Sequence, residues 1–198
     1  TQTKLAQQRI ERLAYTDNLT NLGNRPAFIR NLDERFARDS DTPISLLLVD
    51  IDNFKRINDS LGHQTGDKLL ISLARRLRNS LSPSGSLARF ASNEFAVLLD
   101  DTDLEAGQQM ACQLLMTLDK PMFVDNQLIS VTGSVGVASA PLHGRDPQTL
   151  MRNAGLALHK AKANGKHQVQ VFTEALNAEA SYKLFVENNL RRALTQNE

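Results

Sequence analysis

A short apolar run that ends in two acids constrains this chain more than any other feature. Residues Ile44–Val49 are apolar except for Ser45 and have the length of one strand, which is typical of a central strand buried on both faces. Asp50 and Asp52 follow directly. Two carboxylates at such a strand end could hold Mg²⁺ together with a backbone carbonyl and phosphate oxygens. Two acids alone more often mark a strand end that leaves the core and meets water. The surrounding residues must therefore decide between a metal site and a solvated strand end.

Helical periodicity and short β-rich runs alternate along the rest of the chain. This order predicts an α+β sandwich in which helices cover a mixed sheet. Helices are predicted at 24–36, 69–81, 103–118, 146–164 and 174–198, and strands at 44–49, 87–91, 94–99, 122–124, 128–139 and 169–172. Asn24 and Asp146 are the expected helix caps, because their side-chain oxygens can accept hydrogen bonds from the first free backbone N–H groups.

Composition narrows the function classes. The 198 residues carry 23 Lys and Arg against 22 Asp and Glu, a net charge of +1, and 41% are hydrophobic. Such a chain is globular, and its near-neutral charge argues against nucleic acid or an anionic membrane surface as a partner. No apolar stretch approaches the ~20 residues of a membrane-spanning helix. The single cysteine, Cys112, has apolar neighbours, so we expect it to pack in the core and form no internal disulfide.

Four short motifs occur in order along the chain. They are DNLTNLGNR at 17–25, the stretch from Asp50 to Asp67, RFASNEF at 89–95 and AKANGK at 161–166. Each is weak alone, but four in this order and spacing are specific. Together they resemble the GGDEF domain, the diguanylate cyclase family that joins two GTP molecules into cyclic di-GMP, over residues 17–172.

The resemblance implies a fold and a domain organisation. The fold would be a nucleotide-cyclase-like palm, with a central, mostly antiparallel five-stranded sheet covered by helices and a small additional β-hairpin. Residues 1–15 would form an N-terminal connector helix, 16–173 the GGDEF domain, and 174–198 a C-terminal helix leading toward an EAL domain. The segment 187–194 is similar to the connector that joins the two domain types, although an ordinary amphipathic helix is the rival explanation.

The resemblance also assigns roles to individual residues. Asp50 and the backbone carbonyl of Ile51 would bind Mg²⁺ that accompanies GTP. Asn58 and Asp67 would contact the guanine edge, and the phosphates would face three lysines: Lys55, Lys162 and Lys166. Taken singly, Asn58 and Asp67 could equally cap loops, and the lysines could equally lie on a solvated surface. Lys166 stands where the family usually has arginine, which replaces a bidentate fork with a point charge.

The signature motif itself is degenerate, because it consists of Ala91, Ser92, Asn93, Glu94 and Phe95. Ala91 and Ser92 replace two glycines, so we expect crowding against a nucleotide and strain in a turn that favours positive φ. Asn93 replaces a metal-binding acid, and an amide neither contributes charge nor accepts a proton as a base. Loss of a general base typically costs ~10²–10⁴ in rate. Glu94 is next along the strand and is expected to point to the opposite face.

These departures predict a domain that does not synthesise cyclic di-GMP. The favoured function is a regulatory, GTP-binding module that controls an attached EAL domain, a cyclic di-GMP phosphodiesterase, so that the parent chain and not this domain is the enzyme. A weakly active cyclase is the first alternative. A purely structural module that forms a homodimer through its connector helices is the second. The resemblance further implies a bacterial, cytoplasmic domain and leaves a membrane anchor elsewhere in the parent open.

Overall fold

The computed structural model describes residues 13–39 and 41–196, and its centre is a five-stranded sheet. The strand order is β2-β3-β1-β6-β7, with every neighbouring pair antiparallel except β6 and β7. This confirms the predicted α+β fold with a mostly antiparallel five-stranded sheet. The strands are β1 (Ile44–Ile51), β2 (Ser86–Arg89), β3 (Glu94–Asp100), β6 (Gly133–Ala140) and β7 (Val169–Val171).

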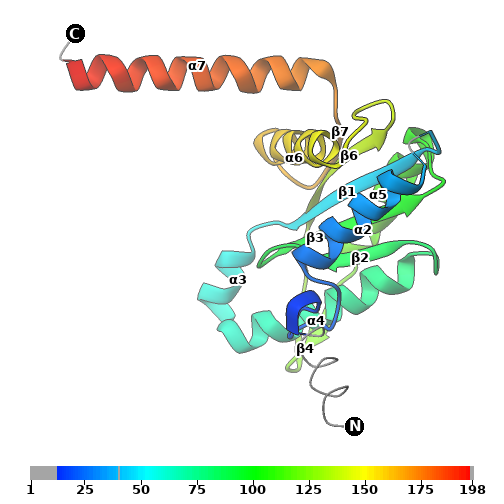
Figure 1. Cartoon of the computed structure of the whole chain (residues 1–198). Coiled ribbons are helices and arrows are strands. Elements are labelled where there is room, and N and C mark those ends of the chain that lie inside the picture. The colour runs from blue at the N-terminus through cyan, green and yellow to red at the C-terminus, as the bar shows by residue number, and fades with distance from the viewer. Residues whose placement is uncertain (1–12, 40, 197–198) are drawn as a thin grey trace.

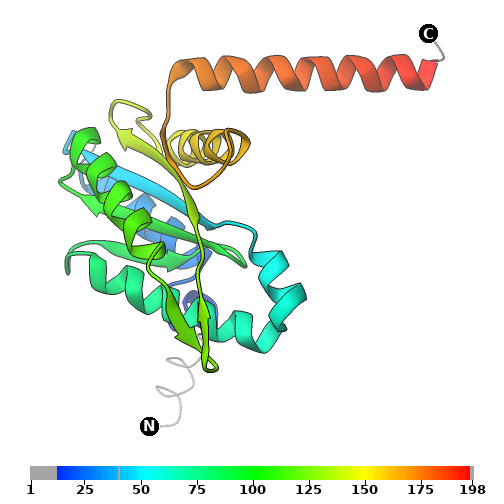
Figure 2. The same cartoon turned by 180° about the vertical axis from the view of Figure 1, so that it is seen from behind.

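Helices cover both faces of this sheet (Figures 1 and 2). One apolar cluster packs α4 and α5 against one face, and a second packs α2 and α6 against the other. Alternation along β1 produces this division, because Leu47 and Val49 enter the first cluster while Leu46 and Leu48 enter the second. The helices are α2 (Arg25–Arg38), α3 (Phe54–Leu61), α4 (His63–Ser80), α5 (Leu104–Leu118), α6 (Pro147–Ala163) and α7 (Glu174–Gln196).

The predicted helix caps are confirmed. The side chains of Asn24 and Asp146 each accept a hydrogen bond from the backbone N–H three residues later, at 3.1 and 2.8 Å. Asp103, which was not predicted as a cap, does the same at 2.9 Å. Each bond satisfies one of the N–H groups that a helix start leaves free. The starts of α2, α5 and α6 are therefore encoded locally.

The predicted strand at 128–139 is wrong. The chain instead forms β5 (Gln127–Ile129), which pairs with β4 (Met122–Val124) in a separate two-stranded sheet, and then β6 in the central sheet. Between them, Ser130–Thr132 belongs to neither sheet. A single straight strand could not pair with β4 and β1 at once, and the apolar periodicity of the segment does not reveal the change of sheet.

The expected burial of Cys112 is also wrong, because its side chain is exposed. The buried face of α5 carries Gly107, Ala111, Leu114 and Leu118. Cys112 is one position beyond Ala111, which turns it about 100° away from this stripe. The apolar residues next to Cys112 in sequence therefore did not indicate which face of α5 carries it.

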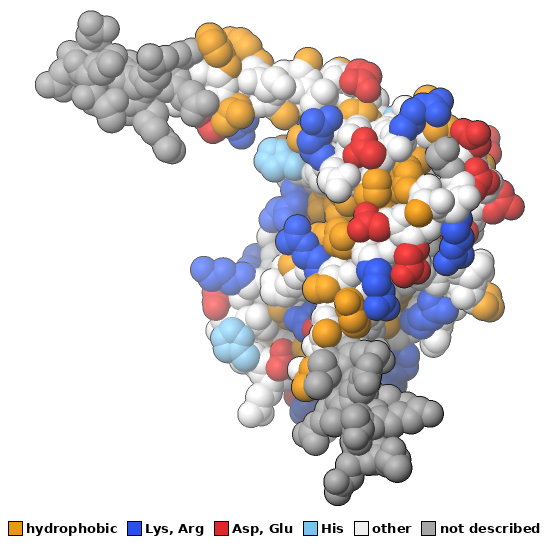
Figure 3. Space-filling model, viewed as in Figure 1, with side chains coloured by type: hydrophobic (Ala, Val, Ile, Leu, Met, Phe, Trp, Pro, Cys, Tyr) orange, Lys and Arg blue, Asp and Glu red, His pale blue; other side chains and the backbone are white. Residues whose placement is uncertain are grey.

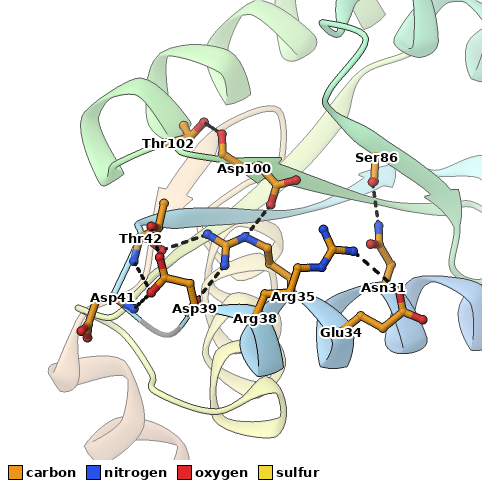
Figure 4. Close-up of polar contacts among 10 residues, drawn as sticks. All are labelled: Asn31, Glu34, Arg35, Arg38, Asp39, Asp41, Thr42, Ser86, Asp100 and Thr102. Atoms are coloured by element: carbon orange, nitrogen blue, oxygen red, sulfur yellow. Dashed lines mark hydrogen bonds and ion pairs between the residues drawn. The ribbon is translucent and has the colours of Figure 1, made fainter.

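A polar cluster joins α2 to the end of the sheet far from Asp50 (Figure 4). Nε of Arg35 lies 2.9 Å from Oδ1 of Asp100, and its terminal nitrogens donate to the backbone carbonyls of Asp39 and Thr42. The Asp39 carboxylate accepts hydrogen bonds from Thr42 and Asp41, and these bonds, with the Thr42 hydroxyl first, lower the pKa of Asp39. This cluster fixes the connection from α2 into β1.

The C-terminal helix α7 extends away from the body of the domain (Figures 1 and 2). Its first turns are held by the buried side chain of Leu176 and by an ion pair of 2.9 Å between Lys160 and Glu179. Farther along, Tyr182 and Phe185 are exposed. The helix expected at 1–15 lies outside the described residues except for its last three positions. Among the described helices, none has the length and apolar composition that a membrane crossing requires.

Candidate functional site

The site expected from the sequence forms where β1 ends. In the register of the sheet, Asp50 faces Glu94 of β3 on one side and Ser134 of β6 on the other. Helix α3 begins just after β1, and the last turns of α6 lie over the same end of the sheet, because they supply Lys162. Residues far apart in sequence therefore meet around one buried strand end.

Asp50 is 3% exposed and is paired with a lysine. Nζ of Lys162 lies 2.9 Å from its Oδ2 atom. Burial, and then the adjacent charge of Asp50, raise the pKa of Glu94, whereas Lys162 and Arg25 oppose that rise. A buried carboxylate needs a compensating charge, and here an ammonium group from α6 provides it.

Asp52 is held as a structural anchor. Its two carboxylate oxygens accept hydrogen bonds from the hydroxyls of Thr132 and Ser134, at 2.8 and 2.7 Å, and from the backbone N–H of His167 at 3.1 Å. Its own N–H donates to the Thr132 carbonyl. Asp52 therefore ties the start of α3 to β6 and to the turn after α6.

That turn positions Lys166. Gly165, Lys166 and His167 have φ values of +111°, +65° and +48°, a left-handed excursion that is costly for the two residues with side chains. The hydrogen bond from His167 to Asp52 helps to hold it. Nζ of Lys166 then lies 2.6 Å from Oδ1 of Asn53, at the entrance to α3. The structure therefore brings Lys166 and Lys162 to the same strand end.

The Asn93 side chain forms a hydrogen bond with the Ile51 carbonyl, the backbone group that was expected to bind metal. Its Nδ2 atom donates to the carbonyl of Ile51 at 3.0 Å, and the Ile51 N–H donates to the Asn93 carbonyl at 3.0 Å. A carboxylate at this position could share a cation with that carbonyl, whereas an amide N–H takes the place of the cation.

The site does not offer the set of free oxygen donors that a divalent cation needs. The Ile51 carbonyl is occupied by an N–H group, and Asp50 is occupied by an ammonium group. The described part of the chain also holds no cluster of three acidic, histidine or cysteine side chains suited to a metal. Hard cations such as Mg²⁺ require several free oxygen ligands. The residues as arranged do not fit one.

The hairpin that carries the signature is anchored by an interaction that sequence reasoning did not single out. Arg89 forms an ion pair of 3.2 Å with Asp17, and both side chains are largely buried. Its guanidinium also donates to the Ser92 carbonyl at 2.7 Å. Burial raises the pKa of Asp17, but hydrogen bonds from Thr20 and the charge of Arg89 outweigh that effect and lower it. The DNLT sequence was the available signal, because an aspartate followed by threonine three residues later favours a self-bonded turn.

The expectation of a positive φ in this hairpin is wrong. Among the described residues with positive φ, none lies between Phe90 and Glu94. Phe90 and Ala91 instead donate their N–H groups to the Glu94 carbonyl, which closes a wider loop. Ala91 and Ser92 therefore impose no backbone strain. Both side chains are exposed, so they would affect only a ligand that approaches from solvent.

The remaining predicted residues lie on α3 and α4. The Asn58 amide packs over Gly66, where an added Cβ would lie 1.9 Å from Asn58 Oδ1. That oxygen is buried and has no hydrogen-bond partner. Asp67 follows on α4 and is exposed, as is Lys55 on α3. Gly66 therefore allows the close approach that brings Asn58 beside the first turn of α4.

Charge around these elements is mixed in sign. On the face shown in Figure 3, basic and acidic side chains are interspersed and do not gather into one broad basic surface. Broad basic surfaces are what nucleic-acid binding relies on. A few placed lysines around Asp50 are a better match to one small anionic ligand.

Fold and site together define an α+β domain of the nucleotide-cyclase type. Solved structures share this fold. The GGDEF domain of PA1120 (YfiN or TpbB) from Pseudomonas aeruginosa matches 78% of this chain and 98% of its own, at 32% identity and a TM-score of 0.74. The coiled coil and GGDEF domain of DgcB from Caulobacter crescentus, in complex with c-di-GMP, matches 86% and 92%, at 27% identity and a TM-score of 0.79.

The sequence comparison identifies the family. The family described as "Diguanylate cyclase, GGDEF domain" matches residues 14–168, and the chain belongs to this family. Cyclic di-GMP phosphodiesterase NbdA of Pseudomonas aeruginosa is 37% identical over 98% of this chain, and cyclic di-GMP phosphodiesterase PdeR of Escherichia coli is 34% identical over all of it. The chain spans only 25% and 30% of the length of these two relatives.

Proposed function

We propose that this domain is a regulatory module of cyclic di-GMP signalling that binds GTP and does not couple two molecules of it. The supporting observation is the hydrogen bond from Asn93 to the Ile51 carbonyl, together with the ion pair of Lys162 and Asp50. The first puts an N–H donor where a cation would need an oxygen, and the second pairs the buried Asp50 carboxylate with an ammonium group.

The chemistry of synthesis requires a group that helps to deprotonate the attacking hydroxyl and a cation that stabilises phosphoryl transfer. Asn93 can do neither, because an amide has no proton-accepting role as a base at neutral pH. Loss of general-base assistance alone costs about 10²- to 10⁴-fold in rate. A domain with this arrangement is therefore expected to hold a nucleotide without turning it over.

Nucleotide binding is supported by one buried acceptor that lacks a partner and by lysines near the end of β1. Asn58 Oδ1 is a buried acceptor without a donor, and a guanine N–H group would satisfy it. Asp67 lies exposed nearby and could accept from the same edge of the base. Lys55 is an exposed cation, and Lys166 is half-buried with its Nζ bonded to Asn53. Both could face the phosphates, and Lys162 could exchange part of its contact with Asp50 for a phosphate oxygen.

Calorimetric titration with GTP tests the binding half of the proposal. We expect binding that is similar in Mg²⁺ and in EDTA and that is lost in Asn58→Ala. Asn79→Ala is the matched control, because Asn79 is an exposed asparagine on α4. No heat with millimolar GTP, or equal losses in the two variants, would contradict the proposal.

A weakly active cyclase is the second candidate, and one observation favours it. Glu94 faces Asp50 across β1 and β3, so two carboxylates remain at the strand end. Product analysis after incubation with GTP and Mn²⁺ separates the two candidates, with the triple variant Ala91→Gly, Ser92→Gly, Asn93→Asp as the gain-of-activity comparison. Cyclic di-GMP formed by the unaltered chain at a turnover close to that of the triple variant would replace our proposal with this one.

The proposal for the parent protein rests on the relatives. NbdA and PdeR are named cyclic di-GMP phosphodiesterases, and we propose that this domain controls an EAL phosphodiesterase attached through α7 in a bacterial, cytoplasmic part of a longer chain. The test is phosphodiesterase activity of the full-length protein with and without GTP. A GTP response that persists in Asn58→Ala would contradict control through this site. Scattering at several concentrations tests the alternative of a purely structural, dimerising module.

A further inference from the structure

The described surface contains a groove on the side of α3 that does not carry Asn58. It has a volume of about 510 Å³ and lies between α3 and the segment from Gln127 to Thr132. The helix contributes positions 53, 56, 57, 60 and 61, whose spacing of three and four residues defines one face. This groove adjoins the candidate nucleotide site only at Asp52 and Asn53.

The other wall is the edge of a strand. Six consecutive residues, 127–132, line the groove. Because successive side chains of an extended segment point to opposite faces, contact with every residue in turn means that the groove runs along the backbone and not over one face. β5 pairs with β4 alone, so its second edge has no partner strand.

Hydrogen-bonding groups along this edge lack internal partners. In the part of the chain that the structure describes, the backbone groups of Ser130 and Val131 make no hydrogen bond to another backbone group. An unpaired edge of this kind is a template for one more strand. The segment 127–131 provides about 17 Å of such an edge when extended, and beyond it the Thr132 carbonyl already accepts from the Asp52 N–H.

The helix wall supplies apolar contacts and one uncompensated charge. Ile57, Leu61 and Leu128 line the groove, and Leu61 and Leu128 are 38% and 61% exposed. Among the described residues, no acidic side chain forms an ion pair with Arg56, which lies on the same face of α3. An occupant therefore needs apolar side chains on one face and a carboxylate within reach of Arg56.

We propose that this groove binds an extended peptide segment of a partner protein, which adds as a strand to the free edge of β5 and places an acidic side chain against Arg56. Strand addition between an edge strand and a helix combines backbone hydrogen bonds, which provide affinity, with pockets for alternate side chains, which provide specificity. The groove offers both components. The proposal does not depend on nucleotide binding.

A random heptapeptide library displayed on phage is the probe. We expect enriched peptides to alternate apolar residues and to contain Asp or Glu, and their synthetic, fluorescein-labelled forms to bind the chain in an anisotropy titration. Arg56→Gln should weaken binding about tenfold, the worth of one charge-assisted hydrogen bond. Arg145→Gln is the matched control, because it removes the same charge from an exposed position in the loop before α6. Equal thermal unfolding of both variants shows that they fold.

Peptides methylated on alternate backbone nitrogens separate strand addition from ordinary side-chain docking. Methylation of the nitrogens that face β5 should abolish binding, and methylation of the others should not. Amide hydrogen exchange at residues 127–131 should slow when the unmodified peptide binds. The proposal is overturned if no peptide is enriched, if both methylated forms bind equally, or if Arg145→Gln weakens binding as much as Arg56→Gln.

Discussion

Replacing Gly136 by alanine tests whether close contact between α6 and the sheet holds the lysine-bearing helix in place. A Cβ on Gly136 would lie 2.3 Å from the backbone nitrogen of Leu158 and 2.4 Å from the carbonyl oxygen of Ala154. Ordinary contact begins at 3.4 Å, so α6 or β6 would have to retreat by about 1 Å. Both neighbours are helix backbone, which cannot turn aside as a flexible side chain can.

The expected cost is at the upper end of the range for overpacked cores, about 3 kcal/mol or more. For a domain of this size each kcal/mol lowers Tm by about 2–4 °C, so Gly136→Ala should unfold roughly 6–12 °C below the unaltered chain. Gly155 on α6 is the matched control, because an added Cβ there meets nothing within 4 Å. Gly155→Ala should raise stability by up to ~1 kcal/mol through helix propensity.

Thermal unfolding followed by circular dichroism measures both variants under the same conditions. A second readout follows from the position of Lys162, which is carried by the same helix and lies 2.9 Å from Asp50. Displacement of α6 should also weaken GTP binding in Gly136→Ala. If Gly136→Ala melts within a degree or two of the unaltered chain, or if Gly155→Ala loses as much, the close packing of α6 does not carry the stability assigned to it.

Three further variants test the site. Glu94→Gln should be more stable than the unaltered chain at pH 7, because the pKa of Glu94 is raised and its ionised form is therefore unfavourable in the folded state. The contribution of Glu94 to folding stability is largest when the carboxyl is protonated and is lost as pH rises. The advantage of the variant should therefore shrink as pH falls toward the ordinary pKa of 4.5. A constant difference from pH 4 to 8 would refute this. Asn93→Asp should make GTP affinity increase with Mn²⁺ in calorimetry, and unchanged metal dependence would refute the role of the amide. Gly66→Ala should displace the Asn58 side chain and abolish GTP binding while the domain stays folded, and retained affinity would exclude Asn58 from the pocket.

Local sequence signals predicted most of the secondary structure correctly. Asn24 and Asp146 mark helix starts through side-chain caps, and these depend on a few neighbouring residues only. The apolar run before Asp50 identified the central strand, because a strand buried on both faces needs no alternation. One error arose where pairing between distant segments decides the strand boundaries. The break between β5 and β6 follows from two different partner strands, which no local pattern records.

The candidate site divides in the same way. The order of residue types along the chain was enough to place Asp50, Asn93 and Lys162 in one family pattern, because the motifs are short and their chemistry is carried by side-chain identity. Only the folded chain decided how these groups pair. The bond from Asn93 to the Ile51 carbonyl spans 42 residues and that from Lys162 to Asp50 spans 112. Such contacts depend on sheet register and on the distance between α6 and β6, which are properties of packing and not of sequence order.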